Sequence, residues 1–307
     1  MGFATTVQQV GLMTIFILLG LFSARKGWLG PETSSGLTNI LVYVVTPCVI
    51  VSAFNRPFAS GQLRNLGVVA LTDACAFLAM IGLVFAIYAR VREPGTRRAL
   101  RFGGIYPNAG YMGIPLVQAL LGPDGVFFAV IFLAAFNVYA WTQGWSMFPA
   151  RGSGGALKRL FTNPAVPSIL FGLALFVSPV KLPRIVATGL ADLSALNAPL
   201  SMFIIGASLA GIAWRTFATD PFVWVGTGVR NLLIPSLAVL ALWAIPLPDE
   251  AKYATLILLS CPVAAFLVMF SIMHEVATDF ATRLVCLSTL VSILTLPAIL
   301  NLARALW

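Results

Sequence analysis

Long apolar segments alternate with short polar stretches along almost the whole chain. A helix that crosses the hydrocarbon core of a bilayer, about 30 Å thick, needs roughly 20 consecutive, mostly apolar residues. We predict ten such spans, which are Thr5–Phe22, Ser35–Phe54, Leu66–Ala89, Ala99–Leu121, Gly125–Met147, Pro164–Val177, Ile185–Ile212, Phe222–Ile245, Lys252–Met273 and Phe280–Leu306. The pattern therefore predicts an all-α polytopic membrane protein with ten transmembrane helices.

The composition supports this class. Hydrophobic residues make up 59% of the chain and charged residues 9%, whereas soluble domains are roughly a quarter charged. The net charge of +9 would suggest a nucleic-acid partner in a soluble protein, but in a membrane protein its distribution among loops matters more. We expect the lipid bilayer as the surroundings and no nucleic acid. Because Met1–Thr6 carries no positive charge and no small-residue cleavage site follows, the first apolar segment is interpreted as a retained span.

The loop charges predict an orientation, because lysine and arginine accumulate in short cytoplasmic loops. The loops after odd-numbered spans carry more of these residues than the other loops and the termini, and the densest run is Arg90–Arg101. We therefore expect this loop in the cytoplasm and both termini on the outer side.

One predicted span contains poor material for a continuous helix. Within the fourth span, Tyr106–Leu116 reads Y-P-N-A-G-Y-M-G-I-P-L. Pro107 has no amide hydrogen, and its ring clashes with the carbonyl four residues back. Since every backbone polar group in hydrocarbon needs a partner, a broken helix survives only where protein or a water-filled cavity covers the break. The stretch predicts an interrupted helix at a polar site.

Landmarks in the two halves of the chain recur at a similar offset. Pro107 and Pro262 are 155 residues apart (262 − 107), as are Asp124 and Asp279 (279 − 124), and Pro47 and Pro199 are 152 apart (199 − 47). Chance alignment in a proline-rich chain is the alternative explanation. The offsets favour two five-span repeats, residues 1–150 and 156–307, joined by Arg151–Gly155.

Five spans per repeat place the two repeats in opposite orientations. Inverted repeats with interrupted helices in matching positions are typical of secondary transporters whose site lies near the middle of the membrane. We therefore predict that spans four and nine are both broken and contribute to one site.

Broken helices would offer their ends to a ligand. Each N-terminal end presents free amides and roughly half a positive charge, which suits a carboxylate. The Asn108 amide can donate and accept hydrogen bonds, and Gly110 allows close approach, whereas the residues around Pro262 are apolar. We predict a site for a small amphipathic organic anion; a proline kink needed only for packing is the alternative.

Two charged residues lie inside predicted spans, where charges are costly and usually face a cavity or a partner. Arg230 could attract an anion and Asp73 could carry a coupling proton, but snorkelling or structural pairing would explain either residue as well. Asn137, in the fifth span, is either a second polar wall of the site or an interhelical hydrogen-bonding residue.

Three further polar residues receive structural interpretations. Asp124 and Asp279, each at the start of a span, are predicted helix N-caps. His274, the only histidine, is interpreted as a solvated loop residue.

Enzyme signatures are missing from the sequence. There is no GxxxxGK[ST] motif for nucleotide-driven pumping, and a single histidine rules out HExxH zinc chemistry. The four cysteines lie in apolar segments without CxxC spacing, which favours buried thiols over metal binding. We expect neither catalysis, nor a metal, nor a cofactor; transport would be passive or coupled to a proton or a sodium ion.

The fourth-span sequence P-N-A-G-Y-M-G-I-P-L resembles that of the auxin efflux carrier family, which includes plant auxin exporters and bacterial carriers. Weaker similarity appears in Asn163-Pro164, in Pro199-Leu200 with Ile205-Gly206, and in Ser288-Thr289 with Thr295-Leu296-Pro297. The resemblance thus covers nearly the whole chain and suggests a bacterial member, placed in the inner membrane.

The resemblance implies ten spans in two inverted repeats, with spans four and nine crossing at the substrate site. It also implies a scaffold of spans 1, 2, 6 and 7 that dimerises, and a transport domain of spans 3–5 and 8–10 that moves in an elevator-type motion. Asn108 would contact the substrate carboxylate, and Pro107 and Pro262 would shape the crossing. The candidate substrate-binding residues are Pro107, Asn108, Gly110, Tyr111, Asn137, Cys261, Pro262 and Val263.

The sequence departs from the plant members in two places. Val263 stands where they carry glutamine, and their long cytoplasmic loop is missing. Bacterial relatives are associated with dicarboxylates such as malonate or malate, so we expect a small organic anion, either such a carboxylate or an auxin-like one. Two alternatives stay open: a sodium-coupled symporter of the bile-acid type, which would need clustered oxygen ligands, and an anion sensor that does not transport.

Overall fold

The computed structural model describes residues 3–58, 60–149, 163–178, 180, 182–211 and 220–307. Within these ranges every regular element is a helix, and the one β-type pairing is an isolated bridge between Pro107 and Val263. The predicted all-α class is confirmed for this part of the chain. The Arg151–Gly155 linker between the predicted repeats lies outside the described residues.

The described residues of the first half form six α-helices, and three short π-helical segments adjoin them. The α-helices are α1 (Phe3–Arg25), α2 (Pro31–Ile40), α3 (Thr46–Phe54), α4 (Ser60–Ile87), α5 (Pro94–Ile105) and α6 (Ile114–Tyr139). The π-helical segments are η1 (Leu41–Val45), which joins α2 to α3, η2 (Ala109–Gly113), which opens α6, and η3 (Ala140–Gly144), which follows it.

The second half has a similar succession. Its α-helices are α8 (Ala165–Val177), α9 (Arg184–Ala195), α10 (Asn197–Ser208), α11 (Pro221–Gly228), α12 (Ile234–Trp243), α13 (Asp249–Leu259), α14 (Phe266–His274) and α15 (Thr278–Leu306). A 3₁₀ turn, η4 (Leu209–Gly211), follows α10, and the π-helical segment η6 (Val229–Leu233) joins α11 to α12.

Six helices in the described ranges are long and apolar enough to cross a membrane, judged by length and composition. They are Glu32–Phe54, Gly61–Ile87, Ala109–Gly144, Arg184–Ser208, Pro221–Trp243 and Thr278–Leu306, and Gly11–Arg25 and Ala165–Val177 are shorter apolar helices. The protein is therefore a multi-pass, all-helical membrane protein, while the count of ten spans and their inverted pairing stay predictions.

A sharp kink divides the long helix α6 where the sequence predicts the boundary between spans four and five. Gly122 has φ +65° and ψ −159°, a conformation that glycine adopts without the strain a Cβ would bring, and Pro123 follows it. Arg56, just after α3, donates to the Asp124 carboxylate and to the Pro123 carbonyl, both at 2.9 Å. The predicted N-cap role of Asp124 is wrong, because Gly122 is the residue with non-helical dihedral angles, so Asp124 lies inside the first turn that follows, where its carboxylate pairs with Arg56.

The prediction for Asp279 is also wrong, because the N-cap position of α15 is Ala277 and Asp279 lies in the first turn. Other acidic residues cap helices instead. Glu93 accepts from the amides of Gly95 and Thr96 at the start of α5. A hydrogen bond with the Thr96 side chain, and after it these amide bonds, lower the pKa of the Glu93 carboxyl. Asp220 accepts from the Phe222 amide at 3.0 Å and so caps α11.

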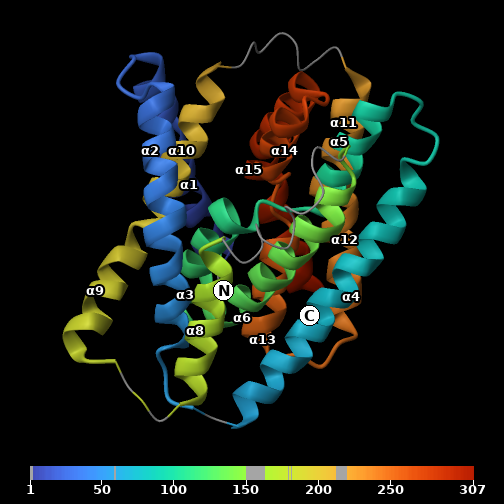
Figure 1. Ribbon diagram of the computed structural model, residues 1–307. Coiled ribbons are helices and arrows are strands. Elements are labelled where there is room, and N and C mark those ends of the chain that lie inside the picture. The colour runs from blue at the N-terminus through green and yellow to red at the C-terminus, as the bar shows by residue number, and fades with distance from the viewer. Residues whose placement is uncertain (1–2, 59, 150–162, 179, 181, 212–219) are drawn as a thin grey trace.

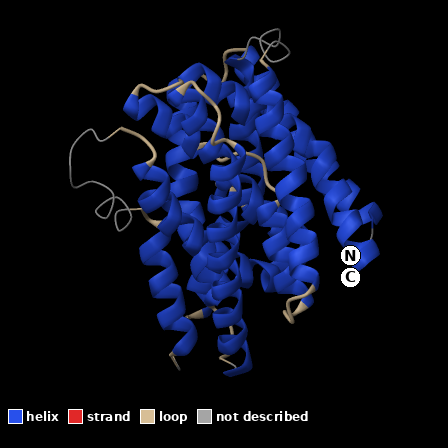
Figure 2. Ribbon diagram, turned by 90° about the vertical axis from the view of Figure 1, so that its right-hand side faces the viewer, coloured by secondary structure: helices blue, strands red, loops and turns tan. Residues whose placement is uncertain are grey.

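The helices form two groups in space. Figure 1 shows α1, α2, α3, α9 and α10 on the left, and α4, α5, α11 and α12 on the right. Within the first group α1 packs along α10, and α3 packs against α8 and α9; in the second, α11 and α14 pack against α15, and α4 and α13 against α6. The view turned by 90° shows mostly long, upright helices joined by short loops (Figure 2).

Glycine allows α1 and α10 to approach closely. A Cβ at Gly20 would lie 2.1 Å from the Phe203 carbonyl oxygen, and one at Gly206 would lie 1.9 Å from the Ile17 carbonyl oxygen. Both contacts are with backbone atoms, which cannot move aside as a side chain could. The packing of the first group therefore requires the absence of a side chain at these two positions.

We expect Gly20→Ala to destabilise the protein by about 1–3 kcal/mol, the usual effect of overpacking, because α1 must move away from α10. Thermal unfolding of the purified protein in detergent measures this as a lower Tm. Gly11→Ala, on the same helix with nothing within 4 Å of its Cβ, is the control and should leave Tm unchanged or slightly raised. Equal Tm values for the two variants would contradict the close packing.

Candidate functional site

Both predicted interruptions are present, and they meet. The first separates α5 from η2 at residues 106–108, and the second separates α13 from α14 at residues 260–265. The Asn108 amide donates to the Pro262 carbonyl at 2.7 Å, and the Ala264 amide donates to the Tyr106 carbonyl at 3.0 Å. These two bonds form the antiparallel bridge of Pro107 with Val263, so segments about 155 residues apart in sequence cross here.

The crossing provides partners for backbone groups that the broken helices leave unpaired. Pro107 and Pro262 have no backbone N–H, so the broken segments contain fewer donors that need a hydrogen-bond partner. The Val263 amide donates to the Ser288 hydroxyl of α15 at 3.1 Å, and Ser288 is fully buried. Each backbone group named here is therefore satisfied inside the protein, as hydrocarbon surroundings require.

The C-terminal ends of α5 and α13 converge on one arginine. Arg230, in η6, is 0% exposed. Its Nε donates to the Cys261 carbonyl at 3.0 Å, its Nη1 to the Gly104 and Ile105 carbonyls at 3.1 and 3.4 Å, and its Nη2 to the Leu259 carbonyl. The last carbonyls of a helix carry partial negative charge and have no intrahelical partner. The guanidinium of Arg230 thus binds the C-terminal ends of α5 and α13.

The N-terminal ends of η2, α8 and α14 lie around a small cavity of about 70 Å³. Its lining residues come from η1 and α3, from η2, from α6, and from the starts of α8 and α14; they are Leu41, Val42, Thr46, Asn108, Ala109, Gly110, Tyr111, Leu133, Phe136, Asn137, Asn163, Ala165, Ala264 and Phe266. Four predicted site residues, Asn108, Gly110, Tyr111 and Asn137, are among them. Pro107, Cys261, Pro262 and Val263 form the crossing behind the cavity.

Three asparagines supply most of the polar groups of this cavity. Asn163 donates through Nδ2 to the Asn137 Oδ1 at 2.8 Å, and Asn137 donates through Nδ2 to the Leu133 carbonyl at 2.8 Å. The Asn108 side chain is 5% exposed and forms no hydrogen bond with the described residues. Its amide is therefore available to a ligand.

Asn163 is a cavity residue that sequence reasoning noted only for its family resemblance. Its Oδ1 accepts from the Ala165 amide at 3.0 Å, so the side chain holds the first turn of α8 while its Nδ2 reaches Asn137. The available signal was an asparagine directly before Pro164 at the start of a span, the pattern of an N-terminal capping turn. That pattern does not indicate which distant residue lies opposite.

Starts of helical segments border this cavity. First residues of three helical segments, Ala109 of η2, Ala165 of α8 and Phe266 of α14, line it. The Ala109 amide donates to the Pro107 carbonyl at 2.8 Å and the Ala165 amide to the Asn163 side chain, so the amides left for a ligand are those of the following first-turn residues of η2 and of Phe266 at the start of α14. A helix N-terminus carries roughly half a positive charge, and no charged side chain is among the lining residues described. The remaining walls are apolar, so a small anion with an apolar portion suits the space.

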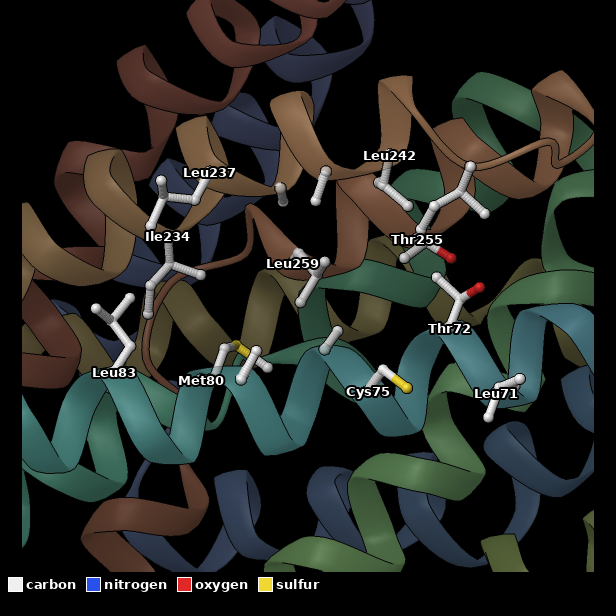
Figure 3. A pocket seen from close by; sticks show the side chains of 15 residues that line it. Leu71, Thr72, Cys75, Met80, Leu83, Ile234, Leu237, Leu242, Thr255 and Leu259 are labelled. Atoms are coloured by element: carbon white, nitrogen blue, oxygen red, sulfur yellow. The ribbon is translucent and has the colours of Figure 1, made fainter.

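Asp73, on α4, lies away from this cavity. It is 0% exposed, its Oδ1 accepts from the Thr255 hydroxyl at 3.3 Å, and its Oδ2 is buried with no hydrogen-bond partner among the described residues. A second cavity of about 520 Å³ lies beside it, between α4, α12 and α13 (Figure 3). Thr72, Cys75 and Thr255 are the polar or thiol-bearing residues of an otherwise apolar lining, which is more suitable for hydrocarbon than for an anion.

His274 is buried at the end of α14, so its interpretation as a solvated loop residue is wrong. The side chain is 4% exposed, and Nδ1 donates to the Pro149 carbonyl at 2.8 Å. Its ring lies 4.6 Å from that of Trp145 and 5.5 Å from that of Phe148. These aromatic residues follow α6 in sequence and cover the histidine, which its local sequence does not reveal.

Crossing helix interruptions beside a small internal site are typical of membrane transporters, and comparison with known proteins supports this class. The chain matches the family described as "Membrane transport protein" over residues 5–300. It therefore belongs to this family, that of the auxin efflux carriers, and the predicted resemblance is confirmed.

Two relatives illustrate the breadth of the family. An "Uncharacterized transporter" of Methanothermobacter thermautotrophicus is 24% identical over 303 residues, covering 97% of each chain. A "Putative malonate transporter" of Rhizobium meliloti is 25% identical over 305 residues, covering 94% of this chain and 93% of the relative. The chain thus spans nearly the full length of both relatives.

Replacement of Ser288 by alanine tests whether the crossing needs a hydrogen-bond acceptor for the buried Val263 amide. The buried Val263 amide would lose its acceptor, which typically costs about 1–3 kcal/mol, so we expect a lower Tm in detergent. Ser146→Ala, at an exposed position where the hydroxyl donates only to the nearby Gln143 carbonyl, is the control. A Tm for Ser288→Ala equal to that of the control would show that the crossing does not depend on this bond.

Proposed function

We propose that this protein is a secondary transporter of a small organic anion, which it exports or exchanges across the membrane. The observation that carries the proposal is the cavity at the crossing, where N-terminal helix ends and the Asn108 side-chain amide, which has no partner among the described residues, face the same small space. Backbone amides at helix N-termini are a general way of binding carboxylates. Membership of a transporter family supports transport, rather than binding alone, as the use of this site.

The substrate is a compact carboxylate. The cavity is small, at about 70 Å³, so a short dicarboxylate fits better than an auxin-like molecule with fused rings. The name of the Rhizobium meliloti relative supports malonate as a first candidate. In this proposal Asn108 donates to one carboxylate, and the amides of η2 and α14 stabilise its charge.

Alternating access of an elevator type explains where the cavity lies. Residues of η1, α3 and α8 form one wall, and residues of η2, α6 and α14 form the other. We assign α1–α3 and α8–α10 to a scaffold that forms a homodimer, and α4–α6 and α11–α15 to a transport domain. Movement of one group against the other would expose the cavity to each side of the membrane in turn.

Two inverted five-helix repeats are part of the same proposal. The interruptions between α5 and η2 and between α13 and α14 occupy corresponding positions in the two halves, and their prolines lie in the same crossing. The loop charges place both termini outside the inner membrane of a bacterium. For coupling we favour a proton carried by Asp73, whose Oδ2 has no partner among the described residues, over a sodium ion.

We expect Asn108→Ala to lower the initial rate of radiolabelled malonate uptake into proteoliposomes by about 10–100-fold at subsaturating substrate. The reason is the loss of a hydrogen bond to a charged group, typically about 1.5–3 kcal/mol. Asn301→Ala, an exposed asparagine on α15, is the matched control and should transport as the wild type does.

Several results would contradict parts of this proposal. Equal uptake by wild type and Asn108→Ala would remove Asn108 from the substrate site. Saturable binding without flux would favour an anion sensor, and uptake that requires sodium would favour a symporter of the bile-acid type.

A further inference from the structure

We propose that Arg230 is the positioning residue of the substrate site: its one guanidinium ties together the C-terminal ends of both interrupted helices and thereby sets the opposing N-terminal ends that face the anion. This inference rests on the proposed function. It assigns to Arg230 a role in substrate affinity without contact with the substrate, since Arg230 does not line the cavity.

The contacts of Arg230 reach both interruptions at once. From η6 the guanidinium donates to the Gly104 and Ile105 carbonyls at the end of α5. It also donates to the Leu259 carbonyl at the end of α13 and to the Cys261 carbonyl two residues after that end. Its Nη1 also lies 3.8 Å from the Met80 sulfur of α4. Four helical segments are thus held in a fixed relation by one side chain that is 0% exposed.

The geometry requires arginine rather than any cation. A guanidinium is planar and presents five N–H donors in a rigid fork, so it can serve several carbonyls in different directions. A lysine ammonium offers three donors from a single point. Lysine at this position would keep the charge but could not hold both helix ends in the same arrangement.

The charge of Arg230 is balanced without a carboxylate. A buried cation is costly unless it is paired, and the hydrogen bonds of this side chain go to carbonyls. Each helix C-terminus carries roughly half a negative charge, so the two ends of α5 and α13 together supply about one. In turn, Arg230 neutralises two negative ends that would otherwise oppose an anion nearby.

The link from Arg230 to the cavity is short. The Cys261 carbonyl accepts from Arg230, and the carbonyl of the next residue, Pro262, accepts from the Asn108 amide at 2.7 Å. On the other segment, Ile105 accepts from Arg230 and Asn108 follows three residues later, which is at most about 11 Å of extended chain. A shift of either helix end therefore moves Asn108 and the first turn of η2.

The test compares malonate affinity with stability. We expect Arg230→Gln to raise the Kd for malonate in detergent and the KM for uptake into proteoliposomes at least tenfold, and Arg230→Lys, which keeps the charge, to fall between this variant and the wild type. Gly20→Ala is the control for stability alone: it lowers Tm in the α1–α10 packing and should leave Kd and KM unchanged. Arg230→Lys also keeps the test informative if Arg230→Gln does not fold.

The outcomes separate the two proposals. If the wild type binds malonate and the Arg230 variants bind it with unchanged Kd and KM, whatever their Tm, Arg230 is only structural and the positioning role is overturned. If the wild type binds none of a panel of malonate, succinate, malate and indole-3-acetate, the proposed function fails and the inference fails with it. Raised Kd in both Arg230 variants, with normal affinity in Gly20→Ala, supports the positioning role.

Discussion

The structure depends on the need to satisfy backbone polar groups where two helices are broken within a membrane protein. The prolines at positions 107 and 262 interrupt the helical hydrogen bonding, and hydrocarbon offers no water to replace it. Each broken segment supplies part of what the other lacks, through the bonds from Asn108 to Pro262 and from Ala264 to Tyr106. Either interruption buried alone would leave backbone polar groups without hydrogen-bond partners, which costs free energy, so the two interruptions lie against each other.

The C-terminal and N-terminal helix ends at this crossing have different surroundings, and this difference makes the site polar. The C-terminal carbonyls of α5 and α13 are occupied by Arg230. The N-terminal ends of η2 and α14 border a cavity instead, where the Asn108 side chain has no partner among the described residues. Partial positive charge therefore faces the cavity, and partial negative charge faces a buried cation.

The position of the cavity relates the site to transport. Its walls come from helices of both spatial groups, with Asn163 at the start of α8 bonded to Asn137 of α6. A site shared between two packed bodies changes its access when they move relative to each other, whereas a site within one body does not. This is consistent with the family to which the chain belongs, and it distinguishes the cavity from the larger apolar one between α4, α12 and α13.

The sequence by itself determined the membrane class, the apolar segments and the interruption at Tyr106–Asn108, because these follow from apolar length and from the missing amide of proline. Only the tertiary structure decided what distant residues do. Arg230 and Asn163 acquire their partners from segments far away in the chain, and His274 is buried by aromatic residues that lie after α6. Asp124 pairs with Arg56 instead of capping a helix. Local pattern sets which backbone groups lack partners, but the packing of distant helices determines which side chains supply them.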